Sequence, residues 1–89
     1  MEQNLSLYKI FYTVAEVGNI SRAARTLYIS QPAISKAISK LEDSLSTKLF
    51  VRNSRGVTLT SEGILLYNHV KSAFDILTRG ENELLRIQE

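Results

Sequence analysis

The 89-residue sequence contains no cysteine, one histidine and one proline. Without cysteine the chain has neither a disulfide framework nor a thiolate metal site, and the single histidine, His69, cannot supply a cluster of metal ligands. The longest unbroken apolar run, ILLY at 64–67, is far too short to cross a bilayer. The N-terminus lacks the basic and apolar segments of a secretory signal. These absences predict one small intracellular domain, or a domain with an appended helix, without a membrane span.

Sequence motifs of common enzyme classes are also missing. The chain has no G-x-S-x-G, no Walker loop, and no histidine paired with a nearby carboxylate along the sequence. We therefore expect neither a catalytic activity nor a cofactor.

Basic residues are concentrated in the middle of the chain. Residues 22–55 contain seven lysines and arginines against two acidic residues, a formal charge of +5, whereas residues 1–21 carry −1 and residues 56–89 carry −2. A local excess of positive charge is typical of a surface that binds a polyanion such as DNA. The alternative is a chance cluster of solvated side chains, which charge alone does not exclude.

The first segment with helical periodicity lies near the N-terminus. Its apolar residues recur at the i, i+4, i+7, i+8 spacing of an amphipathic helix: Leu7, Phe11, Val14 and Ala15. Gly18 follows at a position where glycine commonly ends a helix, and Asn4 or Ser6 can cap the start. A second, shorter helix is expected after a brief link at Asn19, with Ser21 as its N-cap. Its inner face is expected to hold Ala23, Ala24 and Leu27.

The segment ISQPAISKAISKLE, residues 29–42, predicts a third helix with two distinct faces. Ser30 can cap it, and Pro32 fits its first turn, where the missing N–H of proline costs nothing. One stripe is apolar, at steps of four, three and four: Ile34, Ile38, Leu41 and Leu45. The opposite face carries hydroxyls, an amide and two lysines, with no carboxylate before Glu42. This helix is expected to end near residue 44.

A change of period after residue 48 predicts a β-hairpin. LFVR at 49–52 and VTLT at 57–60 are β-prone runs that flank a turn-forming segment at 53–56. The hairpin is expected to carry two arginines, Arg52 and Arg55, at its tip.

A fourth helix is expected after the hairpin. Thr60 or Ser61 can cap it, and Gly63 is tolerable in its first turn. Its apolar residues recur at steps of three and four, with interruptions at Gly80 and Glu81: Tyr67, Val70, Phe74, Leu77 and Leu84. This heptad-like seam predicts pairing with a second chain. The alternative is that all but the last of these five residues are core residues folded back on the bundle.

The predicted elements follow the order of a winged helix-turn-helix: three helices, a hairpin and a fourth helix. The fold is therefore expected to be mainly α. It would be a three-helix bundle with a β-hairpin wing and a long C-terminal linker and dimerisation helix. In that motif the third helix enters the DNA major groove and its N-terminal residues contact base edges. Gln31 can pair with adenine through both amide groups, Ser35 can donate or accept at several bases, and Lys36 can reach guanine or phosphate. Arginines of the wing can lie along phosphates or enter the minor groove.

The candidate DNA-binding residues all lie in the third helix, its cap and the wing: Ser30, Gln31, Pro32, Ala33, Ser35, Lys36, Ser39, Lys40, Arg52 and Arg55. Each has a structural alternative. Gln31 and Ser35 can simply be solvated, the lysines can be ordinary surface residues, and Ser30 is more a cap than a reader. Arg52 can instead pair with Glu42 or Asp43. A rival to the whole assignment is a protein-interaction module that uses its fourth helix and never touches DNA.

The run AARTLYISQPAISKAISKLEDSLSTKLFVRNSRGVTLTSEG, residues 23–63, resembles the DNA-binding domain of LysR-type transcriptional regulators. It matches the pattern A-A-x-x-L-x-x-S-Q-P-A-x-S, followed by I-x-x-L-E, L-x-x-x-L-F-x-R and L-T-x-x-G. The resemblance spans residues 5 to about 67. Three positions depart from the common pattern, with Ala37 where glutamine is frequent, Val51 where an acidic residue is commoner and Glu62 where alanine is usual. Of these, the change at Ala37 can alter sequence preference.

The resemblance implies a cytoplasmic regulator from a bacterium or archaeon that binds an interrupted inverted repeat in double-stranded DNA as a homodimer or tetramer. It divides the chain into a winged helix-turn-helix at 1–60 and a linker and dimerisation helix at 61–89. Regulators of this family continue into a C-terminal domain that binds a small-molecule effector. We therefore expect the chain to be the DNA-binding part of a longer protein, with its effector site outside these residues.

Overall fold

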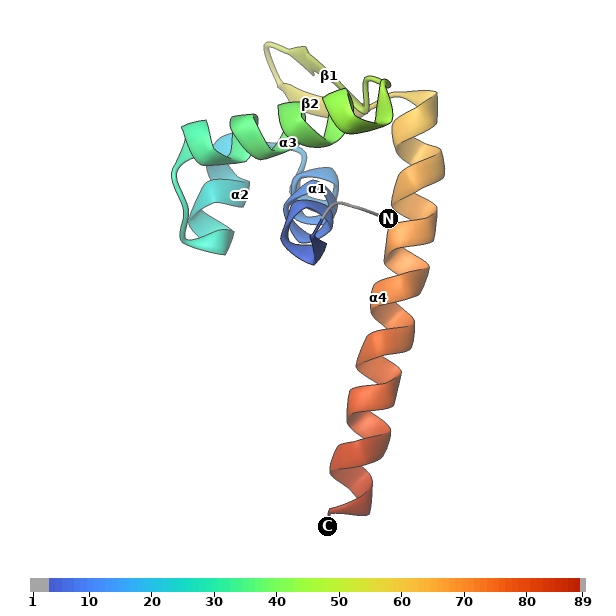
Figure 1. Ribbon diagram of the computed structural model, residues 1–89. Coiled ribbons are helices and arrows are strands. Elements are labelled where there is room, and N and C mark those ends of the chain that lie inside the picture. The colour runs from blue at the N-terminus through green and yellow to red at the C-terminus, as the bar shows by residue number, and fades with distance from the viewer. Residues whose placement is uncertain (1–3, 89) are drawn as a thin grey trace.

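The computed structural model describes residues 4–88, and these form four helices and one two-stranded antiparallel hairpin (Figure 1). The elements follow the predicted order: α1 (Leu5–Val17), α2 (Ile20–Leu27), α3 (Gln31–Leu45), β1 (Phe50–Asn53), β2 (Gly56–Leu59) and α4 (Ser61–Ile87). The predicted fold class is confirmed. Within the described range, no helix combines the length and apolar character needed to cross a membrane.

Side-chain caps fix where three of the helices begin. The Asn4 side chain accepts a hydrogen bond from the Leu7 amide, and the Ser30 hydroxyl accepts one from the Ala33 amide. The Thr60 hydroxyl does the same for the amide of Gly63, at 2.9 Å. Each cap satisfies an amide that has no partner within its helix.

The predicted cap of the second helix is wrong. Asn19, not Ser21, is the N-cap of α2, because its side-chain oxygen accepts a 2.8 Å hydrogen bond from the Arg22 amide. The helix therefore begins at Ile20, and Ser21 lies within its first turn. This releases the Ser21 hydroxyl for contacts outside its own helix.

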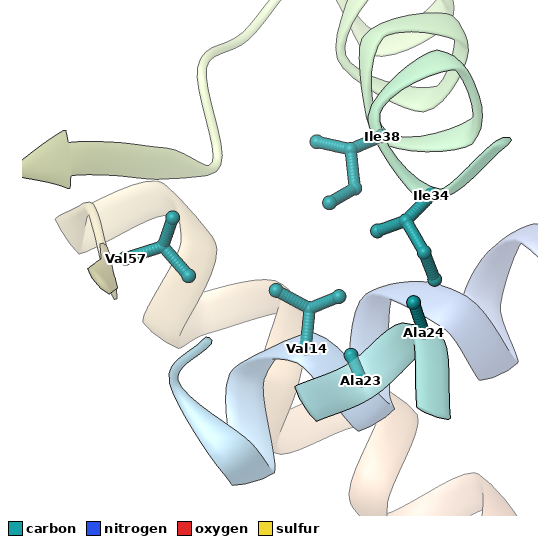
Figure 2. Packing of buried hydrophobic residues seen from close by; sticks show 6 residues of the cluster. All are labelled: Val14, Ala23, Ala24, Ile34, Ile38 and Val57. Atoms are coloured by element: carbon teal, nitrogen blue, oxygen red, sulfur yellow. The ribbon is translucent and has the colours of Figure 1, made fainter. Parts of the chain in front are cut away.

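One hydrophobic cluster joins α1, α2, α3 and β2 (Figure 2). Its six buried members are Val14, Ala23, Ala24, Ile34, Ile38 and Val57. The two alanines let α2 lie close to its neighbours, as expected from their small size. The apolar stripe predicted for α3 is buried except at its last member. Leu45 is 38% exposed, because it is the final residue of the helix and lies beyond the packed interface.

A second cluster fastens the beginning of α4 to α1. Phe11, Leu41, Leu49 and Val70 are its buried members. Around them, the Tyr12 ring stacks on Tyr67 with centroids 5.6 Å apart and meets Phe74 edge-on at 5.5 Å.

The predicted seam of α4 is thus divided between two environments. Tyr67, Val70 and Phe74 pack against the body of the same chain, which is the alternative that the sequence left open. Tyr67 and Phe74 are only half-buried there, so their assignment to a contact with a second chain stays a prediction. Leu77 and Leu84 lie further along, and are 53% and 62% exposed. In Figure 1 this part of α4 extends away from the other elements.

A polar contact also links α1 and α4 beside the aromatic cluster. The Tyr67 hydroxyl donates a 2.8 Å hydrogen bond to the Glu16 carboxylate. Hydrogen bonding by Tyr12 and then Tyr67 lowers the pKa of the Glu16 carboxyl, because both hydroxyls stabilise its charged form. The contact adds a polar link between α1 and α4 to the aromatic packing beside it.

The hairpin is anchored to the end of α1. Its register pairs Arg52 with Val57 and Asn53 with Gly56. The Val57 amide donates a 3.1 Å hydrogen bond to the Gly18 carbonyl, and a side chain at Gly56 would collide with that same carbonyl. Gly56 has φ +137°, which side-chain-bearing residues rarely adopt. Glycine is therefore needed where the wing meets the body.

Candidate nucleic-acid interface

The polar face of α3 is exposed over its N-terminal half. The first turn exposes three candidate residues, Gln31, Pro32 and Ala33, and contains no acidic residue. Lys36, Ser39 and Lys40 are exposed further along, and Ser35 is half-buried. Packing of the apolar stripe against α1 and α2 dictates this orientation. The free amides at the start of α3 add a partial positive charge on this side.

The turn before α3 brings α2 alongside its first residue. Tyr28 adopts a left-handed conformation, with φ 58°, and the Ile29 amide donates back to the Ala24 carbonyl at 3.1 Å. As a result, the Gln31 side-chain amide donates a 3.3 Å hydrogen bond to the Ser21 hydroxyl. The Arg25 guanidinium donates to the same hydroxyl, also at 3.3 Å.

Ser21 and Arg25 lie beside the candidate site, and the sequence prediction did not include them. Their spacing of four on α2 was a signal that they share a face, but only the turn geometry places that face beside Gln31. One N–H of the Gln31 amide is held by Ser21, while its other N–H and its carbonyl oxygen remain for a base edge. The bidentate pairing proposed for Gln31 is therefore compatible with this contact.

The two wing arginines occupy different positions. Arg55 lies in the turn between the strands, where its backbone amide donates a 2.9 Å hydrogen bond to the Asn53 side chain. The prediction that Arg52 also lies at the tip is wrong, because Arg52 belongs to β1 and pairs with Val57. Its guanidinium donates a 3.3 Å hydrogen bond to the Ser35 hydroxyl of α3.

Glu42 has a structural role. It is 8% exposed, and its carboxylate accepts hydrogen bonds from the amides of Leu49 at 2.7 Å and Phe50 at 3.3 Å. Lys48 lies 3.8 Å from the other carboxylate oxygen. Arg52 does not have Glu42 as its hydrogen-bond partner, because this carboxylate faces the base of the hairpin. No carboxylate faces outward from the first half of α3 in the described residues.

The structure therefore brings the two predicted contact regions together. The exposed face of α3 and the hairpin lie at the same end of the molecule, with the end of α4 at the opposite one (Figure 1). The basic and hydroxyl side chains at this end can donate hydrogen bonds to phosphates and base edges. In residues 4–88, no group of three or more acidic or histidine side chains is placed to hold a metal ion.

The sequence and fold match known proteins over most of the chain. The family model described as the bacterial regulatory helix-turn-helix protein, lysR family, matches residues 5–64. The chain belongs to the lysR family. It is 46% identical over 66 residues to the HTH-type transcriptional regulator GltR of Bacillus subtilis, a match that covers 74% of this chain. The same match covers 22% of GltR, so the present chain spans less than a quarter of that lysR-family relative.

Solved structures of other lysR-family domains share the fold. The BenM_DBD/catB site 1 DNA complex has a TM-score of 0.87 and 30% identity, covering 98% of both chains. The CbnR_DBD–DNA complex has a TM-score of 0.82 and 29% identity, covering 98% of this chain and 100% of the other. Both similarities extend over α4, beyond the last residue that the family model matches.

Proposed function

We propose that this chain is the sequence-specific DNA-binding domain of a transcriptional regulator. In this proposal the first half of α3 enters the major groove, and the hairpin contacts phosphates or the adjacent minor groove. The observation that carries the proposal is the exposed, carboxylate-free face of α3 with a base-reading side chain at Gln31, beside a wing that bears two arginines. The BenM_DBD and CbnR_DBD domains, which share the fold, were both solved in complexes with DNA.

Ten residues are proposed to contact DNA, in two roles. Base contacts are assigned to Gln31, Pro32, Ala33 and Ser35, and phosphate or mixed contacts to Ser30, Lys36, Ser39, Lys40, Arg52 and Arg55. The matched relative GltR is named a transcriptional regulator, which supports a regulatory rather than a catalytic role. A regulator of this kind acts in the cytoplasm of a bacterial cell. We propose that any small-molecule effector binds outside these 89 residues. The match covers only 22% of GltR, which leaves room in such a regulator for a further domain.

The function is tested by fluorescence anisotropy with two duplexes, one from upstream of the gene that encodes the chain and one of scrambled sequence. Each is titrated at low and at moderate salt. A preference for the first duplex that survives added salt supports base reading. Equal binding that disappears with salt argues for a backbone binder, and absence of binding to either favours the protein-interaction alternative.

Gln31→Ala is expected to relax the preference at one base-pair position, at a cost of about 1–3 kcal/mol on the preferred duplex. The amide that pairs with a base edge is lost, whereas phosphate contacts remain. Lys40→Ala is the matched control from the same helix. It is expected to weaken binding to all sequences alike and to reduce the salt slope by about one. If both variants weaken every duplex equally, α3 is not the reading helix.

We further propose that residues 1–60 form the DNA-binding domain and residues 61–89 a linker helix through which two chains pair. Its first half is partly covered by α1, so its second half offers the more exposed surface for pairing, with Tyr67, Val70 and Phe74 at its edge. Beyond Phe74, large apolar side chains remain exposed: Ile76, Leu77, Leu84, Leu85 and Ile87. Two exposed apolar groups on one helix, at 76–77 and 84–87, favour a partner surface. Pairing places two α3 helices on successive major-groove faces of an inverted repeat.

Sedimentation equilibrium is expected to show at least a dimer at high protein concentration. Substituting both Leu77 and Leu84 by serine is expected to shift the chain to a monomer, because the burial of two leucines is lost. Leu45→Ser, at the exposed end of α3, makes the same chemical change elsewhere and is expected to leave association unchanged. A monomer at all concentrations for the unsubstituted chain would refute pairing through α4.

A further inference from the structure

The direction of the Arg52 side chain follows from the hairpin register. Side chains of residues directly opposite each other in an antiparallel pair lie on the same face. Arg52 is opposite Val57, whose side chain is buried in the cluster between α1, α2 and α3 (Figure 2). Val51, which precedes Arg52 in β1, lies on the opposite face of the hairpin and is 52% exposed. Arg52 therefore points toward α3 rather than outward from the wing.

The hydrogen bond between Arg52 and Ser35 constrains the serine hydroxyl. A guanidinium has only donors, so Ser35 must be the acceptor in this 3.3 Å contact. With one lone pair directed at Arg52, the hydroxyl hydrogen is directed away from the guanidinium. Among the residues that the structure describes, no acceptor receives this hydrogen. It is therefore available on the exposed side of α3.

We propose that Arg52 is a positioning residue for base reading by Ser35. This role rests on the proposed function. By donating to the Ser35 oxygen, Arg52 orients the Ser35 hydroxyl so that its hydrogen is donated toward the major groove. Purines and thymine present acceptors there, whereas cytosine presents only its amino donor. Ser35 held in this way favours a base that presents an acceptor over cytosine, although its second lone pair can still accept from the cytosine amino group. The remaining donors of Arg52 stay free for a phosphate, since a guanidinium carries five.

Arg55 provides the matched control within the same hairpin. It has the same charge and lies three residues further along, in the turn, where its side chain is exposed. Its backbone amide donates a hydrogen bond to Asn53, within the hairpin and away from α3. Both arginines can neutralise phosphates, but only Arg52 contacts a proposed base-reading residue. Their variants should therefore differ in sequence preference.

The experiment is a binding selection from a library of DNA duplexes with a randomised central segment. It uses the unsubstituted chain, Arg52→Ala, Ser35→Ala, the double variant and Arg55→Ala. The enriched motif is then resynthesised with each of the four base pairs at every position, and dissociation constants are measured. All substituted side chains are partly or fully exposed, so the variants are expected to fold, and circular dichroism verifies this.

We expect Ser35→Ala to identify one position at which a preference of about fivefold or more falls below about twofold. Arg52→Ala is expected to lose the preference at that same position, and the double variant to lose no more than either single variant. Arg55→Ala should weaken binding to all duplexes and reduce the salt slope by about one, with every preference retained. This pattern requires coupling between Arg52 and Ser35 and is not produced by loss of charge alone.

Two results separate the failure of this inference from the failure of the proposed function. If the unsubstituted chain enriches a motif but Arg52→Ala changes preferences no more than Arg55→Ala does, Arg52 is only a phosphate contact and the inference is wrong. Additive losses in the double variant overturn it in the same way. If the unsubstituted chain enriches no sequence at all, the proposed function itself is wrong, and the inference with it.

Discussion

Gly63→Ala is expected to destabilise the chain by about 3 kcal/mol or more, although alanine is the better helix former. Gly63 is buried in the first turn of α4, and its amide is bonded to the capping hydroxyl of Thr60. A methyl group there would overlap the Leu49 carbonyl oxygen and lie 3.0 Å from a terminal carbon of Leu59. That carbonyl also accepts the Thr60 amide at 3.0 Å. Relief of the clash would therefore break the junction between β1 and α4.

Urea unfolding followed by circular dichroism measures this loss. Gly80→Ala is the matched control in the same helix, because a side chain there meets no atom within 4 Å. It is expected to be neutral or to stabilise by up to about 1 kcal/mol, from helix propensity alone. If the two substitutions change the free energy of unfolding equally, the Leu49 carbonyl does not lie against Gly63. A displaced junction should also weaken DNA binding, since the hairpin ends there.

Glu42→Ala is expected to destabilise the chain by about 3–4 kcal/mol. The buried carboxylate accepts hydrogen bonds from the amides of Leu49 and Phe50, and alanine would leave both donors without a partner. A buried donor left unsatisfied costs about 1–3 kcal/mol, and loss of the side chain leaves a void beside it. The ion pair with Lys48 adds little to this total, because Lys48 is 82% exposed. Thermal and urea unfolding measure the effect.

Two further variants isolate the cause of this effect. Glu42→Gln keeps an acceptor oxygen at the same place and is expected to recover most of the lost free energy. Asp43→Ala removes the neighbouring, exposed carboxylate near the end of α3 and is expected to change stability by less than about 0.5 kcal/mol. If Glu42→Gln is as destabilising as Glu42→Ala, the negative charge matters more than the acceptor. If Asp43→Ala is equally harmful, the effect belongs to the end of α3 in general.

Much of the fold was predictable, because its signals are local. Asn4, Ser30 and Thr60 cap amides only three residues away, and the periodicity of α3 and the turn residues of the hairpin act over similarly short distances. The one wrong cap shows the limit of such signals. Asn19 and Ser21 are both good capping residues, and only the path of the chain leaving Gly18 selects Asn19.

The residues of the candidate site could be predicted from the sequence, but the contacts between them could not. The exposed residues at the start of α3 follow from its two faces, since burial of Ile34 and Ile38 fixes the opposite side. Contacts of Ser21 with Gln31 and of Arg52 with Ser35 were not predictable. They join residues that are 10 and 17 positions apart on different elements, and the sequence carries no periodicity linking them.

The sequence by itself determined the order of the elements, the buried stripe of α3 and the lysR-family assignment. Only the tertiary structure decided which side chains of α4 pack against the body of the same chain. Tyr67, Val70 and Phe74 have the same spacing and apolar character as a seam between chains, yet they pack on α1. Periodicity specifies which face of a helix is apolar, whereas the surface that covers that face depends on where the preceding hairpin starts the helix. Here Thr60, just after the hairpin, and Gly63, in the first turn of α4, direct the first half of α4 along α1 and leave Leu77 and Leu84 exposed.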